Sequence, residues 1–119
     1  MGTGNYITNL EDKMDLYVHY VYKVSSKFPR EELYGSVSQL RRSALSVALN
    51  FIEGYARKRP AVKLNFWEIS YGSLKESRYL LKFALVEKWI VEEECVTALK
   101  MADEIGAMLW KALTPLQVQ

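Results

Sequence analysis

The chain has 119 residues, enough for one domain with an ordinary hydrophobic core. Hydrophobic residues make up 50% and charged residues 25%, with six glycines and three prolines, which excludes a disordered chain and favours a compact helical protein. The net charge of +2 is too small to indicate a nucleic-acid-binding protein by itself.

Cysteine content and hydropathy bear on where the protein works. Cys95 is the single cysteine, so no disulfide forms within the chain. The stretch MGTGNYITNLEDK lacks the apolar core of a secretory signal, and no apolar run approaches the roughly 20 residues of a membrane-spanning helix. We therefore expect a cytoplasmic protein that has no membrane partner.

The first predicted helix covers residues 9–28. Thr8 or Asn9 is suited to cap its start, and Pro29 should end it. Its apolar residues recur at spacings of three and four, which is helical periodicity. They are Leu10, Met14, Tyr17, Val21, Val24 and Phe28.

The second helix is predicted over residues 31–58, with a kink or restart near Gly35 and a stop at Pro60. The third is predicted over residues 61–89. Pro60 suits the first turn of this third helix, where its missing N–H costs nothing.

The fourth helix is predicted over residues 91–113 and is closed by Thr114 and Pro115. Its apolar stripe consists of Cys95, Leu99, Ala102, Gly106, Leu109 and Leu113. Four helices joined by short connections favour an all-α fold, an antiparallel up-and-down four-helix bundle, and we expect residues 1–119 to form this one domain.

The second helix has an unusually wide apolar surface. Its polar residues share one stripe, within about 60° of Gln39 around the helix axis. This stripe comprises Gln39, Arg42, Ser43, Ser46, Asn50, Glu53 and Arg57. Apolar residues fill a remaining arc of roughly 200°, about twice what a surface helix usually needs. Either the helix is central in the bundle or part of the arc faces another subunit, and we favour the subunit contact.

Arg41 projects near the middle of that apolar arc. A buried guanidinium is costly unless it is paired and hydrogen-bonded. Our candidate partner is Glu76, at the edge of the apolar face of the third helix. The alternative is that the Arg41 side chain extends along Leu45 and Tyr55 to reach water.

Two other polar residues of the helix have structural interpretations. For Asn50 and Glu53 we expect an interhelix hydrogen bond rather than a catalytic role. Glu53 and Arg57 also have the favourable i, i+4 order, so they can satisfy each other on a solvated face.

Two stretches carry a family resemblance, ELYGSVSQLRRSALSVALNFIEGYARK and, after a short gap, EISYGSLKES. They resemble the four-helix-bundle proteins encoded within intervening sequences of bacterial 23S ribosomal RNA genes and, more distantly, the accessory proteins of diversity-generating retroelements. The residues that match the family motif are Gln39, Arg41, Arg42, Ser46, Asn50, Glu53, Gly54, Gly72, Ser73, Leu74 and Glu76. The family usually has an isoleucine, often followed by proline, and an alanine before the glutamate, where this chain reads SVALNFIEG; these changes stay apolar.

The resemblance implies a homopentameric barrel of four-helix bundles. For the retroelement branch it also implies an RNA-binding partner of a reverse transcriptase, whereas most members have no established biochemical activity. We expect structural or subunit-contact roles for Gln39, Arg41, Ser46, Asn50, Glu53, Gly54, Gly72, Ser73 and Glu76. Around Gly72, the small residues suit a close approach of two helices.

The turn between the second and third helices is basic. Arg57, Lys58, Arg59 and Lys63 lie within seven residues, and Arg42 is on the same helix face as Arg57. Such a turn can present several cations to phosphates, the part of nucleic-acid affinity that does not depend on sequence. These five residues are our candidate RNA or DNA contacts. Exposed aromatic side chains would add base stacking, but the three tryptophans fit core or interface positions more readily.

Enzymatic function is not expected. A di-iron bundle needs paired Glu-x-x-His elements, but His19 is the single histidine and position 16 is Leu16. Cys95 is on an apolar stripe, where a core role is more common than a nucleophilic one. Neither a phosphate-binding glycine loop nor a metal-ligand cluster is present in the sequence, so we expect no metal and no cofactor.

Two functions from different classes remain open. In the first, the protein is a ring-shaped adaptor that binds structured RNA, or a complex of RNA and polymerase, through the basic turn. In the second, it is an oligomeric protein-interaction scaffold without nucleic-acid affinity, and the basic turn only maintains solubility.

Overall fold

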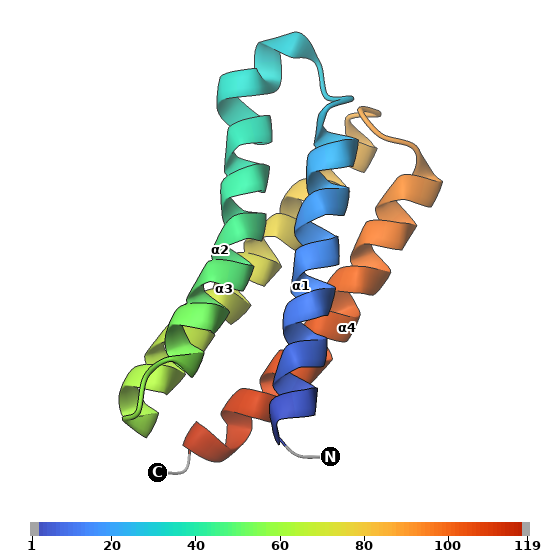
Figure 1. Ribbon diagram of the computed structural model, residues 1–119. Helices are drawn as coiled ribbons and strands as arrows, with labels where there is room; N and C mark the ends of the chain where they lie inside the picture. The colour runs from blue at the N-terminus through green and yellow to red at the C-terminus, as the bar shows by residue number, and fades with distance from the viewer. Residues whose placement is uncertain (1–2, 118–119) are drawn as a thin grey trace.

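The computed structural model describes residues 3–117, which form four α-helices. They are α1 (Thr3–Ser25), α2 (Ser38–Tyr55), α3 (Pro60–Val86) and α4 (Glu92–Gln117). Successive helices run in opposite directions, and the start of α1, the α2–α3 turn and the end of α4 lie at one end of the bundle (Figure 1). Residues 3–117 contain no β-strand, so the predicted all-α four-helix bundle is confirmed.

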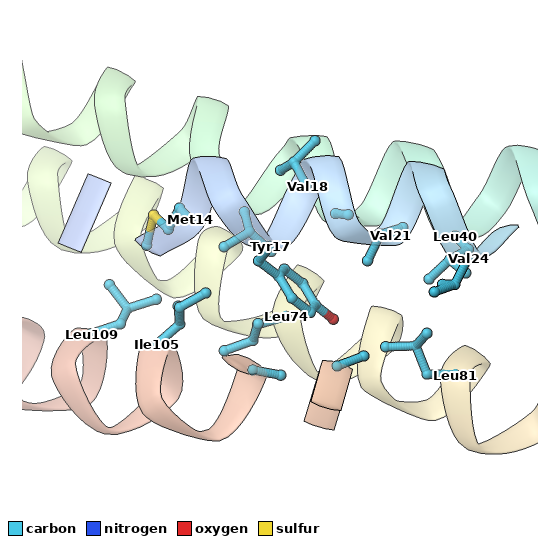
Figure 2. Close-up of a cluster of buried hydrophobic side chains, with 14 of the residues drawn as sticks. Met14, Tyr17, Val18, Val21, Val24, Leu40, Leu74, Leu81, Ile105 and Leu109 are labelled. Atoms are coloured by element: carbon cyan, nitrogen blue, oxygen red, sulfur yellow. The ribbon is translucent and has the colours of Figure 1, made fainter. Parts of the chain in front are cut away.

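The apolar stripes of the four helices meet in one core. Figure 2 shows Tyr17 of α1 pointing into this core, next to Leu74 of α3. The Tyr17 side chain is fully buried, and its hydroxyl is 2.7 Å from Oγ of Ser77, which is also buried. Burial raises the pKa of Tyr17 to about 12, because the charged phenolate is disfavoured away from water. The core therefore includes one polar pair that is internally satisfied.

The connection between α1 and α2 is longer than predicted, because α1 ends at Ser25 rather than at residue 28. A 3-10 turn, η1 (Arg30–Glu32), and a π turn, η2 (Leu33–Val37), come before α2, around the predicted kink at Gly35. The carboxylate of Glu32 accepts hydrogen bonds from the Ser36 backbone N–H (3.4 Å) and hydroxyl (2.6 Å). This side-chain cap holds the irregular turns in place and gives α2 a later start than the predicted residue 31.

The end of α3 is a Schellman motif that the sequence did not suggest. Lys88 has φ 65°, in the left-handed region that glycine usually occupies at this position. The backbone N–H groups of Lys88 and Trp89 donate to Leu85 O and Ala84 O, both at 2.9 Å. The helix therefore stops at Val86, three residues before the predicted end at residue 89.

Proline does not end α4, contrary to prediction. The helix continues through Pro115 to Gln117 instead of closing at Leu113. A proline removes its own backbone donor and crowds the carbonyl four residues before it, and here the proline lies only two residues before the end of the helix. The Thr114 hydroxyl also donates to Trp110 O at 2.6 Å, which fits the helical conformation of this last part. Among the described helices, none is both long enough and apolar enough to span a bilayer.

Candidate nucleic-acid interface

The basic turn occupies residues 56–59, between α2 and α3. The α2 helix ends at Tyr55, where the N–H groups of Ala56 and Arg57 donate to Ile52 O and Gly54 O. Arg59 has extended backbone angles (φ −77°, ψ 124°), as expected of a residue that precedes proline. The local sequence therefore forms a short reversal that projects its side chains from the tip of the α2–α3 hairpin.

The cations of the basic turn differ in whether they already have a partner, either a carboxylate or an aromatic ring. Arg57 forms an ion pair with Glu53, and its guanidinium lies 5.2 Å from the Phe66 ring centroid. Lys63 is half-buried, with its ammonium 5.6 Å from the rings of both Tyr55 and Trp67.

Lys58 and Arg59, by contrast, are exposed, and within residues 3–117 neither takes part in an ion pair. The pairing of Glu53 with Arg57 is the i, i+4 contact that the sequence predicted. Lys58 and Arg59 are therefore the two cations of the turn that are available to phosphates.

Arg42 lies near the start of α2, far from the basic turn. The helix ends at Tyr55 and not at the predicted residue 58, so Arg57 does not share a helix face with Arg42, and Tyr55 is thirteen residues, about 20 Å along the helix axis, from Arg42. Arg42 instead lines a polar pocket of about 300 Å³ between α2 and α3. The pocket residues are Gln39, Arg42, Ser43, Ser46, Ser73 and Glu76, so most of them were singled out from the sequence. The structure therefore places Arg42 with an acidic residue rather than with the other candidate phosphate contacts.

Below the polar pocket, hydroxyl groups connect α2 with α3. Ser46 Oγ and Ser73 Oγ are 2.7 Å apart. The Asn50 amide donates to Ser46 Oγ (2.8 Å) and to Ser46 O (3.0 Å), both within α2. The interhelix hydrogen bond predicted for Asn50 or Glu53 is therefore wrong in its residues, because the shorter Ser46 and Ser73 side chains make it instead.

The predicted pairing of Arg41 with Glu76 is also wrong. The Arg41 side chain points toward α1, where Nε donates to Ser25 Oγ (2.8 Å) and a terminal nitrogen donates to Tyr22 O (3.2 Å). Its guanidinium carbon is 4.6 Å from the Tyr22 ring centroid. Glu76 is exposed on α3, on the other side of α2. A hydroxyl, a carbonyl and an aromatic face together replace the expected carboxylate.

The two motif glycines have different surroundings. Gly54 is buried, and a Cβ at this position would lie 2.5 Å from Cδ1 of Trp67. Gly72 is exposed, and a Cβ there would have no atom within 4 Å. Gly72 itself therefore meets no neighbouring helix, but the close approach predicted around it is made by Ser70 and Ser73, whose hydroxyls lie 2.6 Å from Val47 O and 2.7 Å from Ser46 Oγ of α2. Gly54 permits a further close contact between α2 and α3.

The tryptophans divide between core and surface. Trp67 is buried and donates from Nε1 to Phe51 O at 3.0 Å. Trp89 is half-buried against Phe28, with ring centroids 5.1 Å apart. Trp110 is 49% exposed, so it is not a core residue of this chain, and its place at a subunit interface stays a prediction. Leu109, the residue before Trp110, is buried in the core. The next position is rotated by about 100° around the helix, so the Trp110 indole reaches the surface.

The candidate reactive residues show no catalytic arrangement. Cys95 is buried, and burial raises the pKa of its thiol, which suits a core residue. His19 is exposed, with Nε2 3.3 Å from Oδ1 of Asp15. No group of three or more His, Cys, Asp or Glu residues within the described part of the chain could hold a metal ion.

The sequence profile of the 23S rRNA-intervening sequence protein family matches residues 10–111, which include α2, the basic turn, α3 and most of α1 and α4. The chain belongs to this family. Membership in the 23S rRNA-intervening sequence proteins confirms the resemblance to that family carried by residues 32–58 and 68–77.

A solved structure shares the fold of this member of the 23S rRNA-intervening sequence proteins. It is a protein of unknown function from the S23 ribosomal protein family of Bacteroides thetaiotaomicron VPI-5482. The two structures superpose with a TM-score of 0.82 over 88% of this chain and 98% of that chain, at 19% sequence identity. At this identity the likeness supports the fold alone. No curated protein matches the sequence.

Proposed function

We propose that the protein is a non-enzymatic, oligomeric adaptor that binds nucleic acid, with RNA as the preferred ligand. Copies of the chain assemble through an exposed apolar face of α2, as a homopentamer if the expectation from the family holds. The assembly repeats the basic turn around one end, where the phosphates bind.

The observation that carries the nucleic-acid part is the freedom of Lys58 and Arg59. Both are exposed at the tip of the α2–α3 hairpin, and no carboxylate within residues 3–117 pairs with either. A cation that neutralises a phosphate releases a condensed counterion, and this release favours binding. Each added copy of the chain multiplies these contacts.

The observation that supports assembly is how the bundle divides the apolar arc of α2. Leu40, Ala44, Val47 and Phe51 are fully buried in the core. Leu45, Leu49 and Ile52 are 36%, 60% and 50% exposed, at helical spacings of four and three on one face. The bundle alone therefore leaves part of the apolar arc uncovered. A contiguous exposed apolar stripe is typical of a contact surface, so we assign this part of the arc to the contact with another subunit.

The choice of RNA follows from the family. The family description links its members to intervening sequences of 23S rRNA. An RNA that contains such a sequence is a natural ligand for a basic oligomer. A reverse transcriptase is the protein partner that the more distant resemblance to retroelement accessory proteins suggests.

The proposal is tested by filter binding of a structured RNA across a salt series. The variant carries Lys58→Gln and Arg59→Gln, and the control carries Lys23→Gln and Arg30→Gln, which are also exposed and lie near the opposite end of the bundle. Both variants lose the same charge, so only its position differs. We expect the turn variant to weaken binding and to flatten the plot of log K against log salt by about 1 to 2 units per subunit engaged. Equal binding by the two variants would reject the proposal.

Assembly is tested independently by light scattering. Leu49→Lys together with Ile52→Lys should reduce the particle to the mass of one chain, whereas Leu16→Lys should not. Leu16 is 62% exposed on α1, so it matches Leu49 in exposure. If the oligomer persists and RNA binding is absent, the alternative of a protein-interaction scaffold without nucleic-acid affinity is the better description.

A further inference from the structure

A groove of about 290 Å³ runs between α3 and α4. Its floor is apolar, formed by the buried side chains of Leu74 and Ala102. The α4 side of the groove is built from small residues, Gly106 and Ala107, so the helix leaves room beside Trp110. The volume is at the lower end of the range of about 300–1,000 Å³ that small-ligand sites occupy. It suits one planar ring rather than a larger molecule.

Two aromatic rings stand at one side of this α3–α4 groove. The centroids of Tyr71 and Trp110 are 5.4 Å apart, with their planes tilted by 48°. Trp110 is 49% exposed, so a large part of an indole surface faces water. An exposed indole next to a second ring offers a face on which a flat group such as a nucleobase can stack.

The charged residues of the groove are not balanced. Nε of Arg78 donates to Oδ1 of Asp103 at 2.8 Å, so these two charges neutralise each other. The ammonium of Lys75 lies 5.2 Å from the Tyr71 ring centroid and, among residues 3–117, is in no ion pair. Two cations and one carboxylate therefore line the groove, and Lys75, whose charge also attracts Asp103, lies beside the exposed rings. An anionic aromatic group would complement this pattern.

We propose that the α3–α4 groove holds an unpaired base of a single-stranded nucleic acid, stacked on Trp110, with the adjacent phosphate near Lys75. This inference rests on the proposed nucleic-acid function and adds a second contact region to it. Tyr71 follows Pro60 by eleven residues, about 16 Å along α3 from the basic turn. The end of α4 that carries Trp110 is at the same end of the bundle as that turn (Figure 1). A strand of a few nucleotides can therefore reach both.

Charge favours a nucleotide over a second copy of the chain in this groove. A subunit contact here would remove Lys75 and the Arg78–Asp103 pair from water, at a cost that an apolar helix face would not offset. The exposed stripe of α2, by contrast, presents leucine and isoleucine without a charge among them. The two surfaces therefore suit different partners.

The test is a tryptophan fluorescence titration with a single-stranded oligoadenylate decamer and, separately, with a duplex of the same length. In the wild-type protein, stacking on Trp110 should quench part of the tryptophan emission when the decamer binds. Trp110→Leu should remove this quenching and weaken decamer binding about tenfold. Duplex binding should stay unchanged, because paired bases are already stacked on each other. Ala107→Leu, which fills the groove without removing a contact, should act in the same direction.

The control is Tyr79→Leu, which removes a 64% exposed aromatic ring from α3 outside the groove. It should leave the decamer affinity and the quenching unchanged. Circular dichroism of each variant shows whether the bundle is intact, and the exposed positions of Trp110, Ala107 and Tyr79 make unfolding unexpected.

Three results would overturn the groove proposal. One is a Trp110→Leu variant that binds the decamer as tightly as the wild-type protein. Another is a lower particle mass of this variant in light scattering with no change in affinity, which would make the groove a subunit contact. A wild-type protein that binds the duplex but not the decamer would also refute it. In each case loss of binding in the Lys58→Gln, Arg59→Gln variant would still support the proposed function, so the two failures are distinguishable.

Discussion

Gly54→Ala is the substitution whose outcome the structure constrains most tightly. In an ordinary helix interior this change adds about 1 kcal/mol of stability through helix propensity. Here the new Cβ would lie 2.5 Å from Cδ1 and 2.7 Å from Nε1 of Trp67, and 3.1 Å from Cβ of Phe66. The first two distances are below any ordinary carbon contact, so the Trp67 ring or the helix backbone must shift.

The Trp67 ring has little room to move. It stacks on Phe51, with centroids 4.9 Å apart, and its Nε1 hydrogen bond to Phe51 O is buried. Overpacking of a core costs about 1–3 kcal/mol, and weakening a buried hydrogen bond adds about 1–3 kcal/mol. After the propensity gain of about 1 kcal/mol is subtracted, we expect Gly54→Ala to lower the free energy of unfolding by about 3 kcal/mol.

The assay is urea unfolding followed by circular dichroism, at one protein concentration because assembly would contribute to stability. The matched control is Gly72→Ala, also within a helix but exposed and with no atom within 4 Å of the new Cβ. It should raise the unfolding free energy by about 1 kcal/mol. If Gly54→Ala is as stable as Gly72→Ala, the tight packing of α2 on Trp67 is not what makes glycine necessary here.

Three further outcomes follow from other contacts. Lys88→Gly should stabilise the protein by about 0.5–1 kcal/mol in the same urea assay, because glycine adopts the positive φ without strain, and no gain would contradict the strained cap. Arg41→Ala should lower the free energy of unfolding by about 1–2 kcal/mol, because the variant loses the hydrogen bonds of Arg41 to α1 and its contact with the Tyr22 ring. Glu76→Gln should change the free energy of unfolding by less than about 0.5 kcal/mol. Equal losses in these two variants would restore the pairing of Arg41 with Glu76. A hydrogen bond from Arg78 lowers the pKa of Asp103 below 3.8, and a hydrogen bond from Lys27 lowers the pKa of Glu94 below 4.5. Each carboxylate therefore contributes stability that is present above these values and is lost as the pH falls through its folded-state pKa. The melting temperature should therefore fall below about pH 4, and fall less in an Asp103→Asn, Glu94→Gln variant; identical pH profiles would contradict this.

Helical periodicity predicted the buried face of α1 well. Leu10, Met14, Tyr17, Val21 and Val24 are all buried on α1, and Phe28 is buried beyond the end of the helix. A spacing of three and four reports which side of a helix is apolar, and burial of that side in a bundle follows directly. Helix ends were predicted less well, since Lys88 carries no signal of a left-handed cap and Pro115 is tolerated near the end of α4.

The sequence predicted the candidate site correctly only where its residues are neighbours along the chain. The basic turn is local in sequence, so Lys58 and Arg59 could be identified without knowing the packing. The partner of Arg41 could not, because the angle of a residue around one helix does not tell which neighbouring helix it meets. Trp110 was missed for a related reason: its exposure depends on the space that Gly106 and Ala107 leave between α3 and α4.

The seam between α2 and α3 also limits how these two helices can move. Ser70 Oγ donates to Val47 O at 2.6 Å, and the Ser46–Ser73 and Trp67–Phe51 hydrogen bonds lie on either side of it. A slide of one helix along the other by a single turn, about 5.4 Å, would separate all three donors from their acceptors. The axial register of the hairpin is therefore locked, and the tip that carries Lys58 and Arg59 stays at a constant height relative to the polar pocket around Arg42. Any rearrangement of the bundle is left to α1 and α4, which lie outside this locked pair.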